Sequence, residues 1–213
     1  MNNTPSPGIP GASVAGLVLA AGAGRRMGGP KALIHDAEGV SWVVRTSRLL
    51  AEAGCAPVVV VVGASAEAAR AELSAEPVEV VEATNWSEGM GASLRTGLTH
   101  LRTHTPSFAV GSGRGGSAVV VVPVDLPGLT VAAVRRVVEN AGAGALVRAT
   151  YGGQPGHPVV IGRAHWDGVI ASARGDEGAR GYLRTHDVEL VECEDIADGT
   201  DADTMQDLPP GHS

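Results

Sequence analysis

Five short runs rich in valine recur along the chain, and they alternate with segments of helical character. Short continuous apolar runs are typical of strands buried on both faces, as in parallel sheets. The runs lie at residues 14–21, 58–62, 78–81, 119–122 and 145–149. The segments between them are rich in alanine or have apolar residues at helical spacing, and they cover residues 41–53, 66–73, 91–101 and 131–140. This alternation predicts an α/β fold, with a doubly wound, mostly parallel sheet and helices on both faces.

The length and composition predict one domain. A chain of 213 residues with 44% hydrophobic residues is long enough to bury one substantial core. We place this single domain at residues 14–208. Residues 1–13 and 209–213 are rich in proline, glycine and serine, so both segments are predicted to be disordered tails. Residues 103–117 are predicted to form a long mobile loop or an insertion.

Charge, hydropathy and cysteine content argue against several classes of protein. The formal net charge of -7 and the aromatic content of 3% do not suit a nucleic-acid surface, which usually combines a basic stripe with stacking rings. No apolar run approaches the roughly 20 residues that span a bilayer, and the N-terminus lacks the features of a signal peptide. Cys55 and Cys193 are too few for a disulfide framework or a zinc cluster. We therefore expect a cytoplasmic protein with free thiols and neither a nucleic-acid nor a membrane partner.

A glycine-rich loop with three cationic side chains follows the first predicted strand. Glycine lacks a Cβ atom, so such a loop can turn sharply, direct successive N–H groups inward and let phosphate oxygens come close. The cations add full positive charge beside these amides in a protein that is acidic overall. The glycines are Gly22, Gly24, Gly28 and Gly29, and the cations are Arg25, Arg26 and Lys31. The loop predicts a binding site for a triphosphate.

Three other interpretations of this loop fit its residues less well. The spacing G-x-x-x-x-G-K-[ST] is absent, which excludes a P-loop. The Rossmann dinucleotide fingerprint is one residue out of register, and Pro30 and the segment HDAEG stand where that motif continues as a helix. A turn that merely connects a strand to a helix remains an alternative, but it would not require two arginines and a lysine within seven positions.

Functional residue types follow three of the predicted strands. The glycine loop follows the first strand, Asn85 the third and Asp125 the fourth. Ligands of an open parallel sheet collect beyond the carboxyl ends of its strands, so we expect these segments to meet in one crevice. A carboxylate such as Asp125 is a natural anchor there for Mg²⁺, which prefers oxygen ligands. A turn or N-cap aspartate before Pro127 is the structural alternative.

Six motifs occur in order between residues 14 and 208. They are LAAGAGRRMGGPKAL at 19–33, NWSEGMGASLRTGL at 85–98, VPVDLPGL at 122–129, GHPVVIGR at 156–163, GDEGAR at 175–180 and DADTMQDL at 201–208. Together they resemble the motifs of the MobA-like nucleotidyltransferases that make the nucleotide forms of the molybdenum cofactor. The resemblance implies a Rossmann-like nucleotidyltransferase fold of the glycosyltransferase A type. It also implies an Mg²⁺-dependent enzyme that transfers CMP from CTP to molybdopterin or the molybdenum cofactor and releases pyrophosphate.

The resemblance assigns roles on the nucleotide side. Lys31 and Arg26 are implied to contact the triphosphate, and Asp125 to hold the metal, which makes these three the expected catalytic residues. The sequence LAAG at the loop is similar to the cytidylyltransferase branch, whereas guanylyltransferases tend to have LAGG, so CTP is favoured over GTP. The implied nucleotide-binding residues are Leu19, Ala20, Ala21, Gly22, Gly24, Arg25, Arg26, Lys31, Asn85, Gly89 and Ser93.

A second metal ligand is expected in the segment DADT near the C-terminus. Asp203 is preferred over Asp201 as this ligand. The chain has Met205 and Gln206 where relatives commonly have Pro-Glu, so the family match is weaker here. The structural alternative is that the segment caps a short helix that begins at Thr204.

The motifs GHPVVIGR and GDEGAR indicate which residues bind the acceptor. The resemblance implies that His157 lines the pterin-binding cleft and that Arg180 meets the terminal phosphate of the acceptor. The alternatives are a structural histidine, and an arginine that pairs back to Asp176 or Glu177 at the start of its own helix.

Three further functions remain open at the level of sequence. The first is guanylyl transfer, or NTP transfer to another phosphorylated metabolite. The second is an NAD(P)-dependent oxidoreductase that binds NADPH without Mg²⁺. The third is a non-catalytic carrier that hands the cofactor to a molybdoenzyme of the xanthine dehydrogenase type. Such a carrier would have little use for both Lys31 and Asp125. A molybdoenzyme of the xanthine dehydrogenase type is equally compatible as a partner if the chain is an enzyme.

Overall fold

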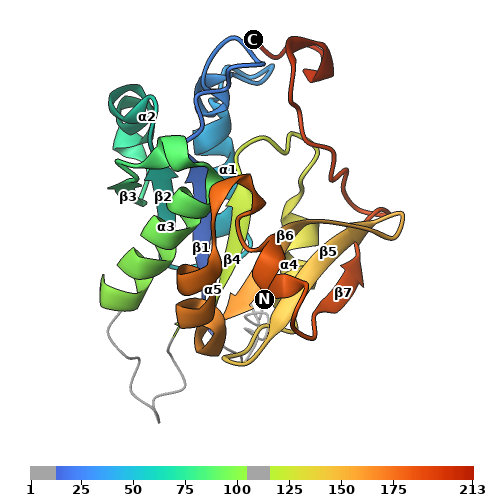
Figure 1. Ribbon diagram of the computed structural model, residues 1–213. Coiled ribbons are helices and arrows are strands. Elements are labelled where there is room, and N and C mark those ends of the chain that lie inside the picture. Colours follow the sequence, from blue (N-terminus) through green and yellow to red (C-terminus); the bar gives the residue numbers. More distant parts are fainter. Residues whose placement is uncertain (1–12, 105–115) are drawn as a thin grey trace, which may run out of the picture.

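The computed structural model describes residues 13–104 and 116–213, which form a seven-stranded sheet with helices on both faces (Figure 1). The strand order is β3-β2-β1-β4-β6-β5-β7. The strands are β1 Ser13–Ala20, β2 Val58–Val62, β3 Glu79–Glu82, β4 Gly116–Pro123, β5 Leu146–Tyr151, β6 Gln154–Gly162 and β7 Glu189–Glu192. The five predicted strands are therefore present, and their boundaries shift by a few residues.

The sheet is mixed because one strand runs against its neighbours. β1 is parallel to β2 and β4, and β2 is parallel to β3. β6 is antiparallel to both β4 and β5, and β5 is parallel to β7. The valine runs indicated the parallel part. They did not indicate β6, which contains two prolines and a glycine near its start, or β7, a short edge strand with a glutamate at each end.

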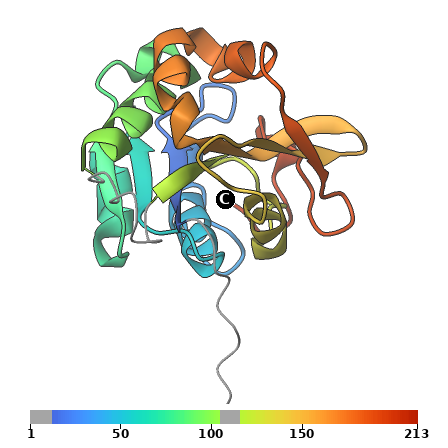
Figure 2. The same ribbon diagram turned by 90° about the horizontal axis from the view of Figure 1, so that it is seen from below.

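The helices cover the two faces of the sheet as two separate layers (Figure 2). The α-helices are α1 Trp42–Glu52, α2 Ala66–Glu72, α3 Met90–His104, α4 Val131–Val138, α5 Trp166–Ser172 and α6 Arg180–Leu183. Buried residues of α1, α2 and α4 share one apolar core with alternate residues of β1, whereas α3, α5 and α6 share the other. The prediction of a doubly wound α/β sheet is thereby confirmed.

The strands are apolar on both faces because both faces are covered. All five valines of β2 are buried. Side chains of β1 alternate between the two cores, with Val18 in one and Leu17 in the other. On α3, a Cβ atom at Gly97 would lie 2.5 Å from Leu17 Cδ1, so this glycine lets the helix approach β1 closely.

The last five residues are held against the domain, contrary to the prediction of a disordered tail at 209–213. Trp42 Nε1 donates a hydrogen bond to His212 Nδ1 at 3.0 Å, and Trp42 is fully buried. The backbones of His35 and Ser213 exchange two hydrogen bonds, with N–O distances of 2.8 and 3.0 Å. The composition of this segment did not reveal these contacts, because they are made to residues far away in the sequence.

Two other predicted segments lie largely outside the described residues. These are the predicted tail at 1–13, of which Ser13 begins β1, and most of the predicted loop at 103–117. Within residues 13–104 and 116–213, no helix combines the length and apolar character that crossing a membrane requires. Cys55 and Cys193 are both buried and form no disulfide. Burial raises the pKa of the Cys55 thiol to about 12.

Candidate functional site

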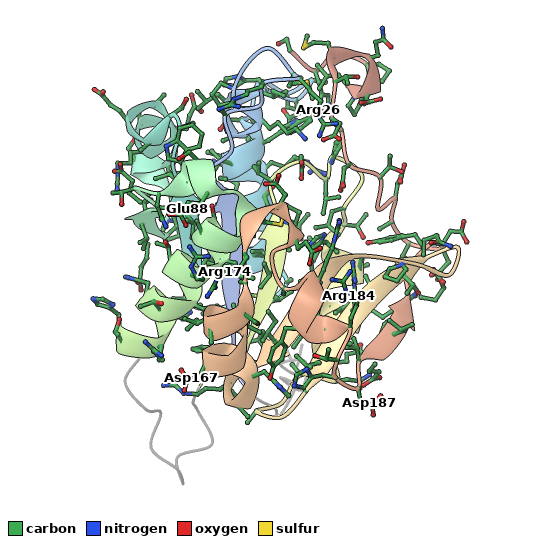
Figure 3. The ribbon with its side chains drawn as sticks, in the orientation of Figure 1. Arg26, Glu88, Asp167, Arg174, Arg184 and Asp187 are labelled. Carbon is green, nitrogen blue, oxygen red and sulfur yellow. The ribbon has the colours of Figure 1, made fainter. Side chains whose placement is uncertain are left out.

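A cleft of about 510 Å³ opens beyond the carboxyl ends of β1 and β4, as the sequence predicted for a parallel sheet. Its volume is in the range of small-molecule and cofactor sites. Segments from six parts of the chain line it: the glycine loop, Lys31, the turn into α3, the end of β4, Asp176 and Asp203. Figure 3 shows Arg26 at this end of the molecule, near the C-terminal segment.

Lys31 joins two carboxylates at the floor of the cleft. Its Nζ donates hydrogen bonds to Asp125 Oδ2 and to Asp203 Oδ1, each at 2.7 Å. Arg26 Nη1 lies 3.1 Å from the other carboxylate oxygen of Asp203. The Lys31 side chain is only 16% exposed, whereas that of Arg26 is 76% exposed. We call Lys31, Asp125 and Asp203 the charged centre of the cleft.

The local structure explains why these three residues meet. Lys31 begins a short 3-10 helix after the glycine loop of β1, and Asp125 follows the adjacent strand β4. The C-terminal segment is tied to β4 by a hydrogen bond of 3.0 Å from the Ala202 N–H to the Asp125 carbonyl. Asp203 therefore arrives beside Asp125, although 78 positions separate them in the sequence (203 minus 125).

The segment after Asp203 is a capped turn, as the structural alternative anticipated. The Thr204 hydroxyl and the backbone N–H groups of Asp203 and Thr204 donate to Asp207 Oδ2. This capping box begins the 3-10 helix Met205–Asp207. Capping and participation in the charged centre are thus compatible, because Asp207 accepts the capping bonds and Asp203 keeps its carboxylate for Lys31.

The charges of the centre shift one another's pKa values. Burial alone would lower the pKa of Lys31, but the hydrogen bonds and charges of Asp125 and Asp203 outweigh it and the pKa is raised. The hydrogen bond from Lys31, supported by the charges of Lys31 and Arg26, lowers the pKa of Asp203. Burial, followed by the charge of Asp125, raises the pKa of Asp201. Asp203, not Asp201, is therefore the C-terminal aspartate that contacts the cations.

The glycine loop depends on Gly24. Its φ of +58° lies in the left-handed region, and its carbonyl accepts a hydrogen bond of 2.9 Å from the N–H of Met27, whose side chain is buried. A Cβ atom at position 24 would lie 1.8 Å from the carbonyl oxygen of Gly29. The two ends of the loop consequently cross at a distance that only glycine permits.

Gly24→Ala is expected to lower the free energy of unfolding by about 2 kcal/mol or more, because the added Cβ combines backbone strain with a steric overlap. Chemical denaturation monitored by circular dichroism measures this change. Gly22→Ala is the matched control, since a Cβ there meets nothing within 4 Å and should change stability by less than about 0.5 kcal/mol. Equal stability of the two variants would contradict the assigned role of Gly24.

Most of the predicted nucleotide-binding residues line the cleft. Ala20 and Asn85 do not: Ala20 is buried in β1, and the side chain of Asn85 hydrogen-bonds to Glu88. The predicted residues in the lining are Leu19, Ala21, Gly22, Gly24, Arg25, Arg26, Lys31, Gly89, Ser93, Asp125 and Asp203. Among the lining residues that the sequence did not assign are Trp86 and Asp176, both of which lie inside motifs quoted for other reasons.

The carboxylates of the charged centre suit a divalent cation that is shared with a ligand. Within the described part of the chain, no cluster of three or more histidine, cysteine, aspartate or glutamate side chains is arranged to hold a metal by itself. Asp125 and Asp203 offer two carboxylates converging on one ammonium group. Mg²⁺ is commonly bound in this way, by one or two carboxylates together with substrate phosphates and water. The donor set thus fits Mg²⁺ bound with a phosphorylated ligand.

The two residues predicted for the acceptor line a second, smaller cavity of about 30 Å³. His157 lies in β6, and Arg180 begins α6. This cavity adjoins the cleft, because Leu19 and Met90 line both. Burial, followed by the charges of Arg148 and Arg180, lowers the pKa of His157 to about 4, so this imidazole is neutral near pH 7.

Comparisons with known sequences find a domain family and a relative that match most of this chain. The sequence profile of the MobA-like NTP transferase domain matches residues 16–190. Nicotine blue oxidoreductase from Paenarthrobacter nicotinovorans is 35% identical over 207 residues, which cover 92% of this chain and 94% of that protein. The profile match includes the glycine loop, Lys31 and Asp125.

Solved structures share the fold over nearly the whole chain. Rv0371c from Mycobacterium tuberculosis H37Rv is 26% identical, with a TM-score of 0.72 over 92% of this chain and 95% of that chain. Its complex with manganese has a TM-score of 0.71 at the same identity, over 92% of this chain and 96% of that one. A nucleotidyl transfer enzyme from Methanothermobacter, 22% identical, has a TM-score of 0.69 over 85% and 88% of the two chains. The predicted nucleotidyltransferase fold is confirmed.

Proposed function

Because the chain belongs to the MobA-like NTP transferase family, we propose that it transfers CMP from CTP to molybdopterin or the molybdenum cofactor with the help of Mg²⁺. An oxygen of the acceptor's phosphate forms a bond to the α-phosphorus of CTP, the bond from that phosphorus to the β-phosphate oxygen breaks, and pyrophosphate leaves. No covalent enzyme intermediate is needed. Catalysis then consists of positioning two polyanions and stabilising the charge that develops between them.

One observation carries this proposal: Lys31 bridges Asp125 and Asp203 directly beside the glycine loop. The loop supplies backbone N–H groups, and Arg25 and Arg26 supply cations for phosphate oxygens. In this proposal, Lys31 stabilises the charge that develops at the α-phosphoryl group. Its raised pKa keeps it protonated for that role near neutral pH.

The balance of charge in the cleft supports a metal–triphosphate complex rather than a bare triphosphate. Three cations, Arg25, Arg26 and Lys31, and three carboxylates, Asp125, Asp176 and Asp203, line it. A triphosphate alone would add several negative charges to a cleft whose cations and carboxylates already balance, whereas a divalent cation would offset part of that added charge. The manganese complex of Rv0371c, a protein 26% identical to this chain, also favours a divalent metal.

The choice of CTP rests on the resemblance of LAAG at residues 19–22 to the cytidylyltransferase branch. The choice of a pterin acceptor rests on the resemblance of the motifs at 156–163 and 175–180 to the acceptor side of the family. A molybdoenzyme of the xanthine dehydrogenase type would be the recipient of the product. The test is release of pyrophosphate with each of four NTPs, with and without molybdopterin, in Mg²⁺ or EDTA. We expect release that needs CTP, the pterin and Mg²⁺ together. Preference for GTP would overturn the base assignment, and tight pterin binding without any release would favour a carrier.

A second candidate function is reduction by NADH or NADPH, because nicotine blue oxidoreductase is 35% identical over most of both chains. The same glycine loop would then hold the pyrophosphate of a dinucleotide. The discriminating measurement is oxidation of NADPH or NADH in the presence of nicotine blue and EDTA. Turnover under these conditions, without pyrophosphate release from any NTP, would replace the transferase proposal with a reductase.

A further inference from the structure

An arginine lies next to the cleft on one covered face of the sheet, in a row of residues that is otherwise apolar. The register aligns Leu17 of β1, Val121 of β4 and Val159 of β6 with Arg148 of β5. Paired residues in a sheet point to the same face, here the face covered by α3, α5 and α6. Arg148 thus stands where a core residue would be expected, and the sequence did not single it out.

Arg148 is held in place by neutral groups alone. Its Nε donates to the Gly156 carbonyl at 3.0 Å, and its Nη2 donates to the Pro155 carbonyl at 3.2 Å. Burial, followed by the positive charge of Arg180, lowers its pKa. Within residues 13–104 and 116–213, neither Arg148 nor Arg180 forms an ion pair with a carboxylate.

The carboxylate that lines the small cavity pairs with a different arginine. Glu177 lines the same small cavity, but its Oε2 lies 3.0 Å from Nη2 of Arg184. His157, the other titratable group in the lining, is neutral and cannot balance the two guanidinium groups. Two like charges that form no ion pair within the described residues repel each other, and a bound anion would reduce that cost.

We infer that Arg148 and Arg180 form a binding site for a phosphate monoester at the mouth of the small cavity. The cavity itself, at about 30 Å³, is too small for a ring system, so only the phosphate lies at its mouth, on the side of the cleft, and the ring system stays outside the cavity. The small cavity shares Leu19 and Met90 with the cleft. The site thus adjoins the cleft, and its assignment to the acceptor's phosphate rests on the proposed function.

The test measures binding without turnover. Phenyl phosphate is titrated into the full chain in EDTA by calorimetry, and CTP with Mg²⁺ is titrated separately. Arg148→Gln and Arg180→Gln are each expected to weaken phenyl phosphate binding by about tenfold or more, because each removes a charge-assisted hydrogen bond. CTP affinity should stay within about twofold. Glu177→Gln should strengthen phenyl phosphate binding, since it removes a negative charge from the lining.

Two controls keep the result interpretable. Arg102→Gln removes an exposed cation that pairs with Asp167 on α5 and should leave both affinities unchanged. Arg180 is exposed, so Arg180→Gln should fold. This variant keeps the proposal testable even if Arg148→Gln loses its hydrogen bonds and perturbs β5. Unchanged phenyl phosphate binding in Arg180→Gln, or an equal loss of CTP affinity, would overturn the acceptor site. Absence of pyrophosphate release, by contrast, would overturn the proposed function and leave this binding result standing.

Discussion

Lys31→Ala is expected to lower the rate of pyrophosphate release by on the order of 100-fold or more, as does the loss of other preorganised donors that face developing charge. The physical reason is the position of its ammonium group, 2.7 Å from both Asp125 and Asp203 and beside the glycine loop. Without this cation, the two carboxylates repel each other and the α-phosphoryl group loses its stabilising charge. Steady-state kinetics at saturating CTP measures the effect.

Arg102→Ala is the control for this variant, because it removes an exposed arginine that pairs with Asp167. It should keep the wild-type rate. Lys31 is also the only lysine in the chain, so an amine-specific reagent can modify no other side-chain amine. Protection of Lys31 from such a reagent by CTP with Mg²⁺ gives a second readout that does not depend on turnover. A wild-type rate in Lys31→Ala would contradict the proposed role.

Asp125→Asn is expected to lower the rate by about 100-fold and to raise the Mg²⁺ concentration needed for half-maximal activity by about tenfold or more. The substitution keeps the shape of the side chain and removes its charge. Among the described residues, it leaves Asp203 as the only carboxylate bonded to Lys31. The measurement is a titration of activity with Mg²⁺ at fixed CTP.

Asp167→Asn is the matched control for Asp125→Asn. Asp167 is exposed on α5, at the end of the molecule opposite Arg26 in Figure 3, and pairs with Arg102. This variant should keep both the rate and the dependence on Mg²⁺. An Asp125→Asn enzyme with a reduced rate but an unchanged Mg²⁺ requirement would show that Asp125 acts on Lys31 and not on a metal.

The sequence was sufficient to predict the parallel half of the sheet and the meeting of Lys31 with Asp125. Valine-rich runs identify strands buried on both faces, and the carboxyl ends of adjacent parallel strands share one edge. Lys31 and Asp125 follow the neighbouring strands β1 and β4, so that rule alone brings them together. The mixed half of the sheet was not predictable in this way, because β6 begins with a proline-containing segment and β7 has little apolar content.

Contacts made by residues far apart in the sequence were the hardest to foresee. Asp203 reaches the centre through the backbone bond from Ala202 to Asp125, which no local pattern indicates. His212 is held by Trp42, although its segment has the composition of a tail. Arg148 lies within a predicted strand, but its orientation toward the small cavity depends on the register with β6. Such contacts depend on tertiary packing, which local propensity does not encode.

The most direct test of nucleotidyl transfer follows the α-phosphorus of CTP. CTP labelled at that phosphorus is incubated with the full-length protein, Mg²⁺ and molybdopterin, and the products are separated and identified by mass spectrometry. We predict that the label joins the pterin as CMP and that one pyrophosphate is released for each CMP transferred. Label that remains in CTP, while the same protein oxidises NADPH or NADH with nicotine blue, would contradict the transferase and establish a reductase on this fold.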